Sequence, residues 1–144
     1  MKTRLGKRAA AAAALALGLA VGIGSPASAA VAPCPSGYAC GWDSTSYSGT
    51  YFASALNKTN WGRQGFGNRA ESAAANGASC QFTRFYKSWN IVTNDVYGDY
   101  FTLYSRQLLG SNYQDPNLSN GAGYDSAGEG SYANTLEAHW FTGC

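Results

Sequence analysis

The sequence predicts an all-β domain, and three observations support this prediction. From residue 30 onward Gly, Ser, Asn, Tyr and Trp dominate, and no window holds apolar residues at helical spacing for three turns. Short aromatic and β-branched runs lie between turn residues, as in the strands of a sandwich or barrel. One segment also recurs within the chain, which indicates two copies of a supersecondary unit packed on a common core.

Six runs are the strand candidates. They are Tyr38–Trp42, Thr50–Ala53, Cys80–Tyr86, Ile91–Thr93, Tyr100–Tyr104 and His139–Thr142. Residues 69–75 are rich in alanine, and we expect one helical turn there. Residues 119–131 are rich in Gly and Ser and read as a loop. The chain therefore offers strands throughout and little helix.

The internal repeat aligns residues 42–52 with residues 91–101 without a gap, at an offset of 49 residues. Each copy has a large apolar residue, six further residues, a glycine and then Tyr-Phe one position later. A weaker similarity joins residues 68–71 to residues 134–137. Each copy is too small to bury its own face, so the two should pack together. The core aromatics that we expect from the repeat are Trp42, Tyr47, Tyr51, Phe52, Tyr100 and Phe101.

The N-terminus has the three parts of a secretory signal peptide. Basic residues precede an apolar stretch, and small residues then suit a cut after Ala29, with a cut after Ala30 as the alternative. The apolar stretch falls short of the ~20 residues that a bilayer requires. We therefore expect a signal peptide over residues 1–29 and a secreted, extracellular domain over residues 30–144, with no membrane partner.

Removal of the signal reverses the sign of the net charge. The whole chain has ten basic and eight acidic residues, a formal charge of +2. Four basic residues and no acidic residue lie in the signal, so six basic and eight acidic residues remain and the net charge becomes −2. No basic patch is left to neutralise a run of phosphates, which excludes nucleic acid as the expected partner.

Four cysteines follow the signal. They are Cys34, Cys40, Cys80 and Cys144. An even number in a small exported chain predicts disulfides, and three pairings are possible. The five residues between the first two include a proline and a glycine and can turn the chain back, so we expect Cys34 with Cys40, which leaves Cys80 with Cys144. Zinc is disfavoured because no close Cys-x-x-Cys pair occurs and His139 is the only histidine.

The first copy of the repeat resembles a known hairpin. Trp42 is followed by six residues and Gly49, with Tyr47 two positions before the glycine, and this spacing is similar to the hairpin of βγ-crystallin Greek keys. A ring packed over a folded hairpin leaves no room for a side chain opposite it, and the turn favours a residue with positive φ. With the signal peptide, the length and the opening from Cys34 to Cys40, the chain resembles the secreted actinobacterial peptidase-inhibitor family of the Streptomyces metalloproteinase-inhibitor type.

This resemblance implies a βγ-crystallin-like sandwich of two Greek keys with two disulfides, and a secreted monomer that inhibits an extracellular metalloprotease. It also implies an inhibitory loop at the third cysteine. That loop comprises Cys80, Gln81, Phe82 and Phe85. The family's loop is closed by a second nearby cysteine, which this chain lacks. The alternative for Cys80–Tyr86 is a core strand, in which case residues 119–131 become the next candidate loop.

No cluster typical of catalysis is present. The chain has no Gly-x-Ser-x-Gly, no His-Glu-x-x-His and no phosphate-binding glycine loop. The expected disulfides leave no thiol, and we expect the lone His139 to be packed or on the surface. The sequence therefore predicts neither an enzyme nor a cofactor. A secreted non-inhibitory module of the βγ-crystallin type, calcium-binding or toxin-like, is the alternative function.

The βγ-crystallin resemblance also implies a possible calcium site. The candidate ligands are Asn68, Glu71, Asn134 and Glu137. In the first copy one oxygen-bearing position of the family pattern is Gly67, and Glu71 replaces a hydroxyl. Calcium takes six to eight oxygens, and this set is short of that number. We therefore expect weak or absent calcium binding and no other metal.

Overall fold

The computed structural model describes residues 33–123 and 130–144. The predicted signal peptide and both cleavage positions lie outside the described residues, as does the middle of the loop at residues 119–131. The strands are β1 (Tyr38–Ser44), β2 (Ser48–Ser54), β3 (Lys58–Asn60), β4 (Ser72–Asn76), β5 (Phe82–Asn90), β6 (Asp95–Tyr104), β7 (Gln114–Asp115) and β8 (Ala138–Thr142). The short 3₁₀ helices are η1 (Thr45–Tyr47), η2 (Gly62–Gln64) and η3 (Leu118–Asn120). Within this part of the chain no helix is long and apolar enough to cross a membrane.

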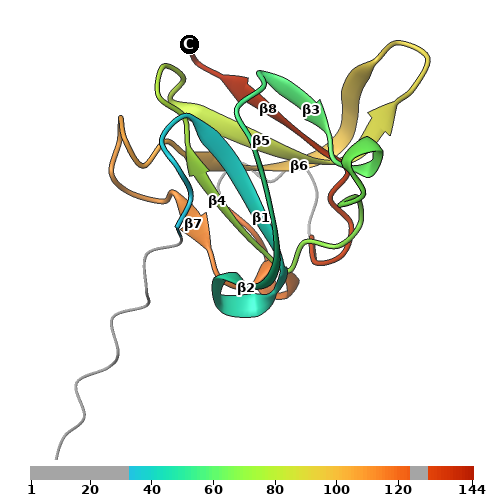
Figure 1. The fold of residues 1–144 in the computed structure, drawn as a ribbon, viewed down its shortest axis with the longest axis horizontal. Coiled ribbons are helices and arrows are strands. Elements are labelled where there is room, and N and C mark those ends of the chain that lie inside the picture. Colours follow the sequence, from blue (N-terminus) through green and yellow to red (C-terminus); the bar gives the residue numbers. More distant parts are fainter. Residues whose placement is uncertain (1–32, 124–129) are drawn as a thin grey trace, which may run out of the picture.

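Two antiparallel four-stranded sheets pack face to face (Figure 1). The strand order is β2-β1-β4-β7 in one sheet and β3-β8-β5-β6 in the other. Strands β1 to β4 form one Greek key and β5 to β8 form a second, and each key contributes its third strand to the sheet of the other. The exchange gives the molecule a pseudo-twofold axis. It confirms the predicted all-β sandwich of two Greek keys.

The main core lies between the sheets. Trp61, Phe85 and Phe101 are fully buried there, and the rings of Phe85 and Phe101 stack with centroids 5.0 Å apart. A smaller cluster on the outer face of the first sheet contains Trp42. Tyr51, which we expected in the core, is 43% exposed, because it lies on the edge strand β2.

Both predicted disulfides are confirmed. Cys34 is bonded to Cys40, and Cys80 to Cys144. The first joins the smaller cluster around Trp42. The second ties the segment just before β5 to the segment just after β8, the neighbouring strand in the second sheet.

Two local predictions are wrong. Residues 72–75 form strand β4 and not a helical turn, because β4 pairs with β1 and β7 and its small side chains are all buried, alternately in the main core and in the smaller cluster. Ile91–Thr93 is a turn and not a strand. The other five runs lie wholly or mostly in strands, with β5 beginning at Phe82.

The strand register also corrects the alignment of the two copies. Trp42 pairs with Tyr51 and with Ser72, and Tyr86 pairs in the same way with Tyr100 and with Ala138. The structural counterpart of Trp42 is therefore Tyr86, where the gapless alignment predicted Ile91. Fourteen positions separate the pair in the second hairpin against nine in the first, so the second hairpin is five residues longer.

Candidate functional site

The β5–β6 hairpin projects beyond its sheet. Pairing between β5 and β8 ends at Tyr86 and Ala138, and beyond it residues 88–90 pair with residues 95–97 of β6 alone among the described strands. The hairpin appears in yellow in Figure 1, extending past the body of the sandwich next to β3. We call residues 88–97 the ribbon. At its tip Ile91 and Val92 are 70% and 90% exposed.

Hydrogen bonds order the tip of the ribbon. The side-chain oxygen of Asn90 accepts hydrogen bonds from the backbone N–H groups of Val92, at 2.9 Å, and Thr93, at 3.0 Å. Asn94 adopts φ of 53°, a left-handed conformation that asparagine tolerates better than most residues. The two exposed aliphatic side chains are therefore held in a defined turn.

The ribbon is also tethered to the first Greek key. Lys58 of β3 places its Nζ 2.7 Å from Oδ1 of Asp95. The same oxygen accepts the backbone N–H of Val96 at 2.8 Å, and these hydrogen bonds, first that from Lys58, lower the pKa of Asp95. Arg63 of η2 donates to the side-chain oxygen of Asn94 at 3.5 Å. Contacts from β3 and η2 thus reach the return strand of the ribbon close to its tip.

The sequence-based prediction missed the ribbon, although the sequence contains a signal for an exposed turn there. Ile91 and Val92 are apolar residues bracketed by Asn90 and Asn94, and asparagines favour turns. An apolar pair enclosed by turn formers indicates an exposed tip better than it indicates a strand.

The predicted inhibitory segment lies elsewhere, at the start of β5, an inner strand of the second sheet. Cys80 is buried in its disulfide and Gln81 is exposed. Phe82 is half-buried against the ring of Tyr104, at 5.4 Å. Phe85 is fully buried in the core, so it can contact a protease only if the domain opens. The geometry corresponds to the core strand that we gave as the alternative for Cys80–Tyr86.

The four candidate calcium ligands do come together, but as hydrogen-bonded pairs. The amide of Asn68 donates to Glu137, and the amide of Asn134 donates to Glu71 at 3.0 Å. Both asparagines have φ of 55°, which places the two segments in matching turns across the pseudo-twofold axis. Each carboxylate thus already has an amide donor from the other Greek key. Whether calcium displaces these donors stays a prediction.

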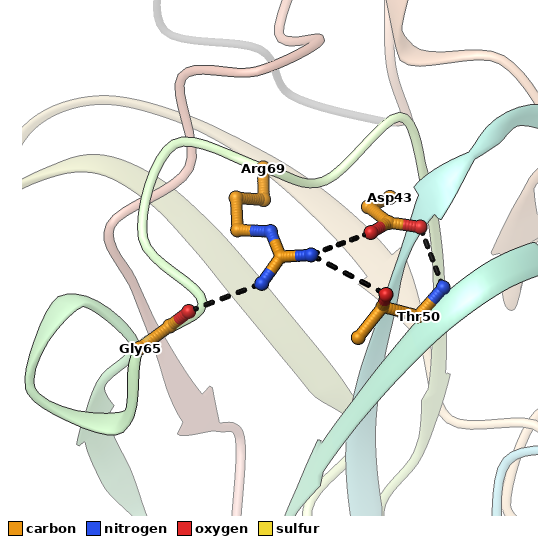
Figure 2. Close-up of polar contacts among 4 residues, drawn as sticks. All are labelled: Asp43, Thr50, Gly65 and Arg69. Carbon is orange, nitrogen blue, oxygen red and sulfur yellow. Dashed lines mark hydrogen bonds and ion pairs between the residues drawn. The ribbon is translucent and has the colours of Figure 1, made fainter.

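A polar network positions the segment that carries Asn68. Figure 2 shows Arg69 reaching from this segment to the first hairpin. Its guanidinium lies 2.7 Å from Oδ2 of Asp43, and it donates to the hydroxyl of Thr50 at 3.3 Å and the carbonyl of Gly65 at 3.4 Å. Hydrogen bonds from Thr50, together with Arg69, lower the pKa of Asp43. The network fastens β1 and β2 to the loop between η2 and β4.

His139 is packed in the core. Its Nδ1 accepts a hydrogen bond from the indole N–H of Trp61 at 2.8 Å, and its Nε2 lies 3.0 Å from the carbonyl of Leu56. Because the first nitrogen accepts, the second donates to that carbonyl. Burial lowers the pKa of His139 to about 4, so the ring is neutral at pH 7. No carboxylate among the described residues contacts it, and both ring nitrogens are hydrogen-bonded within the core, so its role is structural.

An open hollow of about 520 Å³ lies at the opposite end of β5 from the ribbon. Its floor includes Phe141 and the Cys80–Cys144 disulfide, and none of its lining residues is acidic or basic. Within the described residues, no three His, Cys, Asp or Glu side chains gather where they could hold a metal ion.

Residues 27–97 match the sequence profile of peptidase inhibitor family I36. Over these residues the chain belongs to this family. The match includes the first Greek key, the Cys34–Cys40 disulfide and the tip of the ribbon. Comparisons with curated proteins and with solved structures gave no match.

Membership in family I36 confirms the resemblance on which the sequence analysis drew. It supports a protease as the partner and inhibition as the function. The expectation that the chain is not an enzyme rests on this membership alone. The two disulfides are typical of exported proteins and consistent with an extracellular location.

Proposed function

We propose that this chain inhibits a secreted metalloprotease by inserting the tip of the ribbon into the active-site cleft in a substrate-like form. The observation that supports this proposal is the exposure of Ile91 and Val92 at an ordered, projecting tip in a member of an inhibitor family. Metalloprotease as the target class comes from the family resemblance. Thermolysin-like proteases favour large apolar residues beside the cut, and these two side chains supply them.

The physics of binding favours the ribbon over the segment that begins at Cys80. A few apolar anchors carry most of the energy of an interface, and they must be accessible in the free protein. Ile91 and Val92 are accessible, whereas Phe85 is buried. The hydrogen bonds that Asn90 accepts from Val92 and Thr93 order the tip during folding, so less conformational entropy is lost on binding.

The test is an inhibition profile of the mature protein against secreted metallo-, serine and cysteine proteases, followed by variants. We expect inhibition of a metalloprotease. Ile91→Asp and Val92→Asp should each raise the inhibition constant by more than about thirtyfold, equivalent to about 2 kcal/mol. Leu56→Asp is the matched control, since Leu56 is 65% exposed on a different loop.

Three outcomes would change the proposal. Equal effects of the ribbon variants and of Leu56→Asp would remove the ribbon from the interface. A Phe82→Ala variant that stays folded but loses inhibition would instead assign the segment that begins at Cys80. Failure to inhibit any protease of the panel would favour the alternative of a non-inhibitory secreted module.

A further inference from the structure

Strand β3, which belongs to the first Greek key, contributes a charged contact to the ribbon, which belongs to the second. We propose that Lys58 is a positioning residue for inhibition: its ion pair with Asp95 clamps the ribbon in its binding-competent conformation, in place of a covalent closure. The proposal rests on the proposed function, because it assumes that the ribbon is the inhibitory segment. It predicts that inhibition depends on salt.

The ribbon needs such a clamp. A two-stranded hairpin is at best marginally stable on its own in water, and residues 88–97 lie beyond the last pairing of β5 with β8. The register between β5 and β6 also shifts between Tyr86 and Ser88, at the base of the ribbon. Both disulfides are elsewhere in the described structure, so no covalent bridge closes the ribbon.

Lys58 is well placed to supply the missing restraint. It pairs with Trp140 in the register of β3 and β8, and its Nζ lies 4.2 Å from the centroid of the Trp140 ring. The ring and the strand restrict the lysine side chain before it meets Asp95, so the ion pair loses less side-chain entropy than one between two free side chains.

Asp95 passes this restraint to the backbone. Its Oδ1 accepts both the Lys58 ammonium, at 2.7 Å, and the backbone N–H of Val96, at 2.8 Å. The contact therefore fixes the backbone directly after the tip, at Asp95, which is three residues from Val92. The contact between Arg63 and Asn94 adds a second link from the first Greek key to the ribbon.

A second ion pair provides the comparison. Lys87 lies 3.7 Å from Asp99, and both residues belong to the second Greek key. Its ammonium also lies 4.3 Å from the centroid of the Tyr132 ring. Lys87 thus has a carboxylate and an aromatic partner, as Lys58 does, but it does not connect β3 to the ribbon.

The clamp should affect inhibition much more than folding. Exposed ion pairs contribute little to global stability. In contrast, the apparent dissociation constant rises in inverse proportion to the fraction of the free protein that is binding-competent. Loss of the clamp lowers that fraction, and it does so without removing any group that contacts the protease.

The experiment compares Lys58→Met, Asp95→Asn and their double variant with Lys87→Met, at low and high NaCl. Lys58→Met and Asp95→Asn should each raise the inhibition constant about three- to tenfold, and the double variant should add little. Lys58→Arg should retain inhibition. Wild-type inhibition should weaken with salt more steeply than that of Lys58→Met, while melting temperatures change little and Lys87→Met behaves as wild type.

Amide hydrogen exchange at residues 92–96 separates this proposal from the proposed function. Faster exchange in Lys58→Met, with unchanged exchange in the core strands, supports the clamp. If wild type inhibits and Lys58→Met matches it in inhibition constant, salt dependence and exchange, the clamp is refuted and the proposed function stands. If wild type inhibits no protease, the proposed function fails, and with it the role of Lys58 in inhibition, whatever the exchange shows.

Discussion

The β1–β2 hairpin and the β5–β6 hairpin share a sequence pattern but adopt different structures. The first hairpin folds over its own sheet. The Ser72 hydroxyl accepts the backbone N–H of Tyr47 at 3.1 Å and donates to the carbonyl of Ser44 at 2.7 Å. The Tyr47 ring then meets Trp42 edge-on, with centroids 5.4 Å apart. This hairpin is part of the structural framework.

The second hairpin lacks the residue that would fold it back. The register places Ala138 at the position of Ser72, so no hydroxyl is available to hold the turn. The hairpin is also five residues longer, and it projects as the ribbon. The comparison teaches that one hydroxyl and a five-residue insertion separate a hairpin that folds over its sheet from one that projects and exposes the side chains at its tip.

The glycines of the two hairpins give the largest expected difference. Both have positive φ, 81° at Gly49 and 78° at Gly98. A Cβ on Gly49 would also overlap the Asp43 carboxylate, which Arg69 and Thr50 hold in place, whereas a Cβ on Gly98 would lie 3.6 Å from its nearest neighbour. Gly49→Ala should lower the free energy of unfolding by about 3 to 4 kcal/mol and Gly98→Ala by only about 1 kcal/mol.

Urea denaturation of the two glycine variants measures this difference. Equal losses of stability would show that the left-handed conformation, and not the Asp43 carboxylate, sets the requirement for glycine at both turns.

A second difference lies one residue after the equivalent pair Ser72 and Ala138, where β4 has Ala73 and β8 has His139. The folded-state pKa of about 4 is below the ordinary value of 6.5, so protons bind the unfolded chain more tightly. The stability associated with the neutral ring is fully present above pH 6.5 and is lost as the pH falls toward 4. This loss should reach about 3 kcal/mol.

Denaturation curves between pH 7 and pH 4 test the role of His139. Other groups also titrate in this range, so the comparison is with His139→Gln, whose amide can keep both hydrogen bonds. The wild-type curve should fall more steeply. Parallel curves for the two proteins would remove His139 as the cause.

A smaller effect should follow from exchanging the residues that distinguish the hairpins. Ser72→Ala removes two buried hydrogen bonds and should lower the free energy of unfolding by about 1 to 2 kcal/mol. Ala138→Ser should change it by less than about 0.5 kcal/mol unless the new hydroxyl finds a partner. Chemical denaturation gives both values, and a stabilised Ala138→Ser would mean that the ribbon can fold back.

Calcium should have the smallest effect. The Asn–Glu pairs place donors, and not ligand oxygens, against both carboxylates, so low-millimolar calcium should raise the melting temperature by less than about two degrees. An Asn68→Asp, Asn134→Asp double variant replaces the donors with carboxylates and should respond to calcium more strongly. A rise of many degrees in wild type would show that the amides give way to the ion.

The local sequence by itself determined the all-β class, the two-copy organisation, the disulfide pairing and the glycine turns, whereas the Greek-key topology was implied by the family resemblance. Period-two runs, turn residues and the close spacing of Cys34 and Cys40 are short-range features, and their consequences are fixed within a few residues. The pairing of Cys80 with Cys144 then follows because only these two cysteines remain. Gly49 illustrates this, because the hairpin pattern alone predicts its conformation. The buried alanines of β4 show the limit, since alanine has no strong preference for strand and only the neighbouring strands make it one.

The tertiary structure alone decided the register and the candidate functional surface. Tyr86, and not Ile91, became the counterpart of Trp42 because pairing with β6 and β8 sets the register across the sheet. Phe85 turned inward by the same rule, whereas Ile91 and Val92 at the tip of the ribbon stayed exposed. The contact between Lys58 and Asp95 joins residues 37 positions apart in different Greek keys, and no local pattern encodes such a meeting because it depends on β3 crossing to the other sheet.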